Sequence, residues 1–113
     1  MTHSHKSQAG EIVLVFFPFT DLTSHKVRPA LVVKDQWDDD LLLLPITSVT
    51  QENHTALILE DTSYIGKILP IMSFVRFQKP MTLHQSLISK NFSKLTKKKM
   101  NSILHELISF LSR

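Results

Sequence analysis

Two short apolar runs constrain the fold of this chain more than any other feature. Residues 12–18 and 41–46 contain no polar side chain. Residues 11–17 are apolar at nearly every position and rich in β-branched and aromatic side chains, which is typical of a central strand buried on both faces. Both runs are far shorter than the roughly 20 residues that a membrane-spanning helix needs. The sequence therefore predicts a soluble β-rich core built around these two segments.

Further short strands are predicted around these runs. A second strand at about 28–34 should return antiparallel to the first, and 41–46 should form the third. Residues 55–60 alternate weakly as a fourth strand, and 68–77, interrupted by Pro70, should supply one or two more. Short strands with brief connections predict a small antiparallel barrel or half-barrel.

The end of the chain changes to a helical period. Apolar residues recur at spacings of three and four along one stripe, with Thr96 as the expected N-cap: Met100, Ile103, Leu104, Leu107, Ile108 and Leu111. We expect this helix to cover one face of the sheet. Lys97, Lys98 and Lys99 in its first turn oppose the helix dipole with no acidic residue nearby in the sequence to offset them. Their role is either to bind a ligand or to keep the helix soluble.

Length and composition limit the remaining possibilities. The 113 residues, 42% hydrophobic and 20% charged, suit one compact domain, which we place at 10–113 after a flexible polar tail at 1–9. The tail has no apolar signal segment, so we expect a cytoplasmic protein. The absence of cysteine excludes disulfides, thiolate zinc sites and cysteine nucleophiles. With only two glycines, the chain also lacks a glycine-rich phosphate loop.

Charge divides the chain into an acidic first half and a basic second half. Residues 1–61 contain four Lys and Arg residues and nine Asp and Glu residues. Residues 62–113 contain nine Lys and Arg residues and one acidic residue. A basic block favours a polyanionic partner such as nucleic acid, although a solvated lysine-rich face explains the same pattern.

Two polar segments gather the groups that could carry chemistry. One precedes and begins the second strand, and the other ends the third strand with Thr47 and Ser48. If these strands are antiparallel neighbours, Arg28 and Thr47 should share one rim of the barrel, where a guanidinium beside hydroxyl groups suits a phosphate. The alternative is purely structural, with Arg28 paired to a carboxylate and the hydroxyls capping a strand end.

Several segments together resemble the MazF/PemK (Kid) family of toxin–antitoxin ribonucleases. The most specific is Arg-Pro-Ala-Leu-Val at the start of the second strand. The likeness runs from about residue 10 to the end of the chain and includes 10–15, 17–21, 26–33, 44–48 and 73–82.

The resemblance implies a mainly β fold with a C-terminal α-helix, an SH3-like antiparallel barrel of the CcdB/PemK type. It also implies a homodimeric toxin, neutralised by a cognate antitoxin protein and not associated with a membrane. Such a toxin cuts single-stranded RNA, including mRNA, with no metal or cofactor. In this family the ribose 2′-hydroxyl attacks the adjacent phosphate, which gives a cyclic phosphate and a 5′-hydroxyl.

The resemblance also suggests site residues. Arg28 and Thr47 match the arginine and threonine of the family motifs, and Arg76 matches an arginine of PemK-like members. His25, three residues before Arg28, is the nearby group that titrates close to neutral pH and is therefore our candidate acid or base. We expect the RNA-binding residues to be Thr20, Lys26, Ser48, Arg76, Gln78 and Lys79.

The chain departs from the family pattern at three positions in or near these motifs. The family often has glycine where Val27 stands, and PemK-like members have a carboxylate at Gln78 and an arginine at Met81. The carboxylate base of those members is therefore absent. Two alternatives stay open: a CcdB-like toxin that binds a protein and cuts nothing, and a non-catalytic nucleic-acid-binding module on an SH3-like barrel.

Overall fold

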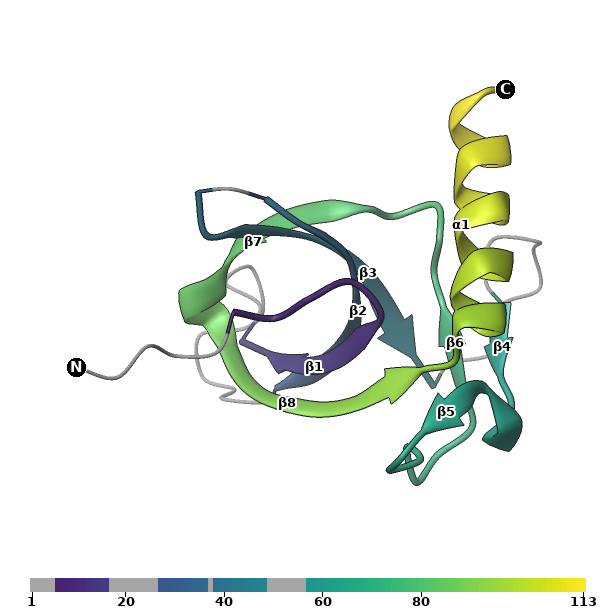
Figure 1. Ribbon diagram of the computed structural model, residues 1–113, viewed down its shortest axis with the longest axis horizontal. Helices are drawn as coiled ribbons and strands as arrows, with labels where there is room; N and C mark the ends of the chain where they lie inside the picture. The colour runs from purple at the N-terminus through teal and green to yellow at the C-terminus, as the bar shows by residue number, and fades with distance from the viewer. Residues whose placement is uncertain (1–5, 17–26, 37, 49–56) are drawn as a thin grey trace.

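The structure is a computed structural model that describes residues 6–16, 27–36, 38–48 and 57–113. Within these residues, eight strands, two short 3-10 helices and one α-helix follow each other (Figure 1). Their bounds are β1 Glu11–Val15, β2 Arg28–Asp35, β3 Asp40–Thr47, β4 Leu57–Leu59, η1 Asp61–Ser63, β5 Tyr64–Ile65, β6 Ser73–Val75, β7 Met81–His84, η2 Gln85–Leu87, β8 Ile88–Leu95 and α1 Lys97–Leu111.

The strands form one antiparallel sheet that curls into a nearly closed barrel. Their order is β4-β6-β3-β2-β1-β8-β5, and β7 pairs with β3 outside this path. The central strands β1, β2 and β3 run side by side, as the sequence predicted. Figure 1 shows the long β8 curving past β1 toward α1, which stands beside β4, β5 and β6. The mainly β barrel with a C-terminal helix is therefore confirmed.

The central strands divide their side chains between two apolar clusters. From β1, Ile12 enters a cluster shared with α1, whereas Val13 and Val15 enter a second cluster with Ala30 and other residues of β2 and β3. Alternate residues of a strand point to opposite faces, so a strand between two clusters must be apolar throughout. This explains why the run that begins at residue 12 lacks the polar alternation of a surface strand.

The C-terminal helix covers the first of these clusters. Thr96 caps it, accepting a hydrogen bond from the backbone N–H of Lys99 at 3.1 Å, and Met100, Ile103 and Leu107 are buried. Lys99 has an acidic partner, because its Nζ lies 3.3 Å from Oε1 of Glu60, a residue distant in sequence.

The part of the expected tail that the structure describes packs against the barrel. Ser7 is fully buried. Its backbone N–H donates to Oε1 of Gln85 at 2.9 Å, and its Oγ donates to Oδ1 of Asn91 at 3.0 Å. Ser7 is therefore held against the barrel by these hydrogen bonds. Within the described segments, no helix is both long and apolar enough to cross a membrane.

Candidate active site

The pairing of β2 with β3 brings Arg28 and Thr47 to the same place. Ala30 lies opposite Pro45 in this antiparallel pair. Two residues further toward the strand ends, Arg28 and Thr47 are the next positions on the same face. Both residues line the same pocket. The expectation that Arg28 and Thr47 share one rim of the barrel is confirmed.

Strand β6 adds Arg76 to this face. Phe74 pairs with Thr47, and the backbone N–H of Arg76 donates to the carbonyl of Pro45 at 2.9 Å. Arg76 therefore follows Phe74 on the face that carries Pro45 and Thr47. Among the described residues, the buried Nε atom of Arg76 finds no hydrogen-bond partner. Because this atom is buried, an acceptor would have to approach Arg76 at the other nitrogens of its guanidinium.

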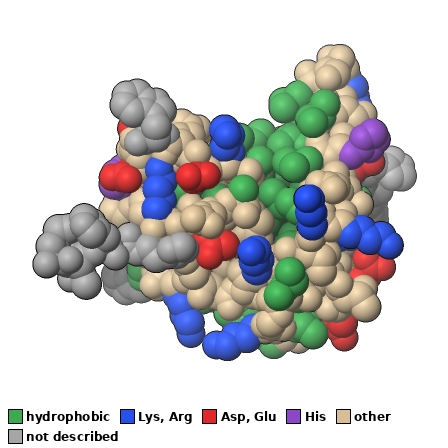
Figure 2. Space-filling model, in the orientation of Figure 1, with side chains coloured by type: hydrophobic (Ala, Val, Ile, Leu, Met, Phe, Trp, Pro, Cys, Tyr) green, Lys and Arg blue, Asp and Glu red, His purple; other side chains and the backbone are tan. Residues whose placement is uncertain are grey.

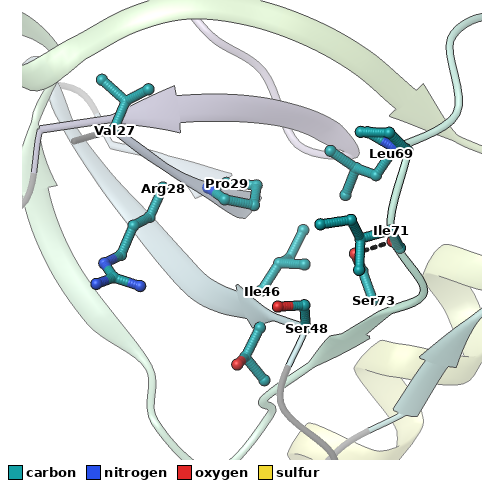
Figure 3. A pocket seen from close by; sticks show the side chains of 10 residues that line it. Val27, Arg28, Pro29, Ile46, Ser48, Leu69, Ile71 and Ser73 are labelled. Carbon is teal, nitrogen blue, oxygen red and sulfur yellow. Dashed lines mark hydrogen bonds between the residues drawn. The ribbon is translucent and has the colours of Figure 1, made fainter.

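A pocket of about 270 Å³ lies at the rim where β2 begins and β3 ends. In Figure 3, Arg28 lies on one side of this pocket and Leu69 and Ile71 lie on the other, with Pro29 and Ile46 between them. The full lining is Val27, Arg28, Pro29, Ile46, Thr47, Ser48, Leu69, Pro70, Ile71 and Ser73. The pocket thus combines one guanidinium and several hydroxyls with an apolar wall.

The apolar wall is the part of the site that sequence reasoning missed. Leu69, Pro70 and Ile71 were expected only to lie in or near a strand, yet they precede β6 in irregular backbone. A signal was available, because the run at 68–72 is entirely apolar although Pro70 interrupts any strand. Such a run outside a strand indicates an apolar surface rather than a core.

The other expected RNA-binding residues are distributed differently. Ser48 is exposed and lines the pocket. Gln78 and Lys79 occupy a turn just after Arg76, in which the backbone N–H of Lys79 donates to the carbonyl of Arg76 at 3.2 Å, and they do not line the pocket. Met81 packs against the second apolar cluster, which accounts for an apolar residue at that position.

Three expected site residues, Thr20, His25 and Lys26, lie outside the described residues. Among the residues that are described, no three or more His, Asp and Glu side chains stand close enough together to hold a metal ion.

On the face seen in Figure 2, charge does not single out a binding site. Figure 2 shows lysine and arginine side chains spread over the visible surface rather than gathered at one point. The site is therefore located by the pairing of the strands and by the pocket, and not by the basic block of the sequence.

Comparison with known proteins decides the family. The model of the PemK-like, MazF-like toxins of type II toxin–antitoxin systems matches residues 8–111. The chain belongs to this family. The resemblance to MazF/PemK is thus confirmed, and with it membership of a family of toxin endoribonucleases. No curated protein sequence matches the chain.

Solved structures of MazF proteins share the fold. MazF of Deinococcus radiodurans superposes with a TM-score of 0.75 at 18% identity, covering 97% of this chain and 100% of that one. A mycobacterial endoribonuclease in complex with its cognate antitoxin gives 0.74 at 15% identity, covering 94% and 95%. The Mycobacterium tuberculosis toxin MazF-mt6 gives 0.66 at 17% identity, covering 87% and 91%. At these identities the MazF barrel is shared along nearly the whole chain.

Proposed function

We propose that this MazF-like toxin cuts single-stranded RNA, including cytoplasmic mRNA, without a metal ion, at the rim that carries Arg28 and Thr47. One observation carries the proposal: in a chain of this family, the antiparallel pairing of β2 with β3 brings Arg28 and Thr47 to the lining of one pocket. A phosphate needs charge-assisted donors that converge on its oxygens, and a guanidinium beside a hydroxyl supplies them.

The reaction has three requirements. The 2′-hydroxyl must lose a proton, the pentavalent phosphorane must be stabilised, and the leaving 5′-oxygen must gain a proton. Arg28 meets the second requirement, because its two terminal nitrogens can donate to two non-bridging oxygens while it remains cationic. Thr47 donates its hydroxyl to the same phosphate. The products are a cyclic phosphate and a 5′-hydroxyl.

Arg76 suits a phosphate next to the one that is cut. It lies one strand beyond Thr47 on the same face, and its guanidinium carries N–H donors besides the buried Nε. A second guanidinium at this spacing would hold the RNA backbone in register without reaching the reacting bond. Lys79 and Gln78 in the following turn and Ser48 at the pocket would extend the contact, as would Thr20 and Lys26.

In this proposal, His25 is the group that transfers protons. The amide of Gln78 does not titrate and cannot replace the carboxylate that PemK-like members carry there. His25 precedes Arg28 by three residues and titrates in the physiological range. It takes the proton of the 2′-hydroxyl and returns one to the leaving oxygen.

We propose a homodimer and a cognate antitoxin as its protein partners. The antitoxin is supported by solved structures of similar fold, since a mycobacterial endoribonuclease was solved with its cognate antitoxin and the Deinococcus MazF was solved as MazE-MazF. One second function also has a specific observation in its favour. Gln78 is consistent with a non-catalytic barrel that binds RNA through Arg28 and Arg76.

Replacing Arg28 separates these two functions. We expect Arg28→Ala to lower the rate of RNA cleavage by roughly 100-fold or more, which is the usual loss when one stabiliser of a developing charge is removed. Arg113→Ala is the charge-matched control, because Arg113 is exposed at the end of the chain beside Phe110. Cleavage should be followed on labelled single-stranded RNA, with folding checked by circular dichroism. A folded Arg28→Ala protein that cuts as fast as Arg113→Ala would refute the catalytic assignment.

A further inference from the structure

The segment between β5 and β6 exposes an unusual amount of apolar surface. Ile68, Ile71 and Met72 are 45%, 62% and 66% exposed. Together with Leu69 and Pro70 they form a continuous apolar stretch outside any strand. Large side chains left in water side by side commonly mark a binding surface.

This segment is held in place from the barrel side. The hydroxyl of the buried Tyr64 shares a hydrogen bond with the backbone of Leu69, and burial raises the pKa of Tyr64. Ser73 Oγ donates to the carbonyl of Ile71 at 2.7 Å (Figure 3), and Ser93 Oγ donates to the carbonyl of Lys67. Three anchors on alternate residues fix the backbone, so the exposed apolar side chains are presented in a set arrangement.

The segment separates two cavities of opposite character. On one side, Leu69, Pro70 and Ile71 face the pocket that holds Arg28, Thr47 and Ser48. On the other side, the same stretch borders a cavity that also contains Met72 and the acidic residues Glu60 and Asp61. The two carboxylates repel phosphate, so an RNA backbone is favoured only on the Arg28 side.

We infer that the Arg28 pocket receives one nucleobase adjacent to the phosphate that is cut, and that Ile71 is the residue that sets which base is preferred. This inference rests on the proposed ribonuclease function and deepens it. The pocket has an apolar wall for the flat face of a base, the hydroxyl of Ser48 for its polar edge, and Arg28 at its rim for the neighbouring phosphate.

The chemistry of RNA favours such a division of roles. Contacts to phosphates fix the position of the strand but carry no sequence information, whereas contacts to bases select the sequence. In single-stranded RNA the bases can turn outward into pockets and be recognised there. Arg28 and Arg76 therefore serve any sequence, and selectivity must come from the part of the site that a base can reach.

The test uses two neighbouring variants, Ile71→Ala and Met72→Ala. The two residues are almost equally exposed, but only Ile71 lines the Arg28 pocket. Wild-type protein and both variants are incubated with a pool of RNAs of random sequence, and the ends produced are sequenced. Removing most of a side chain from an apolar pocket typically costs a factor of about 10 or more in discrimination.

The expected result is a loss of base preference at one position beside the cut for Ile71→Ala, with cleavage retained, and an unchanged pattern for Met72→Ala. An Ile71→Ala pattern identical to that of the wild type would overturn the inference and leave the ribonuclease function standing. A failure of the wild type to cut any RNA would instead refute both. If Ile71→Ala changes the oligomeric state of the protein in solution but not its cleavage pattern, the side chain contacts a second copy of the chain. The base assignment is then wrong.

Discussion

Arg28 and Thr47 show how much of a site can be predicted before a structure exists. Their proximity required only that the second and third strands be adjacent and antiparallel, and the brief turn between them made that the expected arrangement. Arg76 was suggested by resemblance alone, because no local pattern reveals that β6 pairs with β3 after a long excursion through β4 and β5. The unpartnered Nε of Arg76 is a property of packing that the sequence cannot disclose.

The proposed role of His25 makes the rate of RNA cleavage depend on pH. If it transfers the proton, the cleavage rate should show a limb near pH 6.5, where an ordinary histidine titrates, and His25→Ala should slow the reaction and remove that limb. His105→Ala is the control, because His105 is exposed on α1. Rates should be measured on the same RNA from about pH 5 to about pH 9. A His25→Ala profile that keeps the limb would place the proton transfer on another group.

The strands of the first 48 residues and the C-terminal helix followed from periodicity, but β7 and β8 did not. Strand β8 was missed because its sequence, Ile-Ser-Lys-Asn-Phe-Ser-Lys-Leu, exposes most of its length and contains register shifts against β1, which disturb the two-residue alternation. Strand β7 is only half-buried at best and has no buried residue to mark it. Sequence periodicity detects burial, so strands with few buried residues give a weak signal.

Two basic elements compete as the contact for RNA phosphates. Arg76 and Lys79 follow β6 beside the proposed site, whereas Lys98 and Lys99 border a different cavity at the start of α1, and Lys99 already pairs with Glu60. We therefore expect the double variant Arg76→Ala/Lys79→Ala to weaken RNA binding more than Lys97→Ala/Lys98→Ala, although each removes two positive charges.

Salt dependence measures this difference directly. Each phosphate contact that is lost should reduce the slope of log K against log salt concentration by about 0.7 for single strands. Fluorescence anisotropy with labelled RNA over a range of salt concentrations gives the slope for each double variant. Equal slopes for the two variants would show that the turn after β6 has no special part in binding.

At the scale of the whole molecule, the fold separates stability from function. Each of the two apolar clusters takes alternate residues of β1, β2 and β3, and α1 covers the first of them. The ends of these strands and the segment before β6 are then available at the rim. A barrel stabilised from both faces of its central strands can hold Arg28 and Thr47 in fixed register while the rim stays accessible to a ligand.

The most direct test of the central claim is cleavage of single-stranded RNA in the presence of EDTA, followed by analysis of the ends produced. We expect the rate in EDTA to equal the rate without it, with a cyclic phosphate on one fragment and a 5′-hydroxyl on the other, because Arg28 and Thr47 stabilise the phosphorane without a metal ion. Fragments that form only when a divalent metal is added, or that carry a 5′-phosphate, would contradict it.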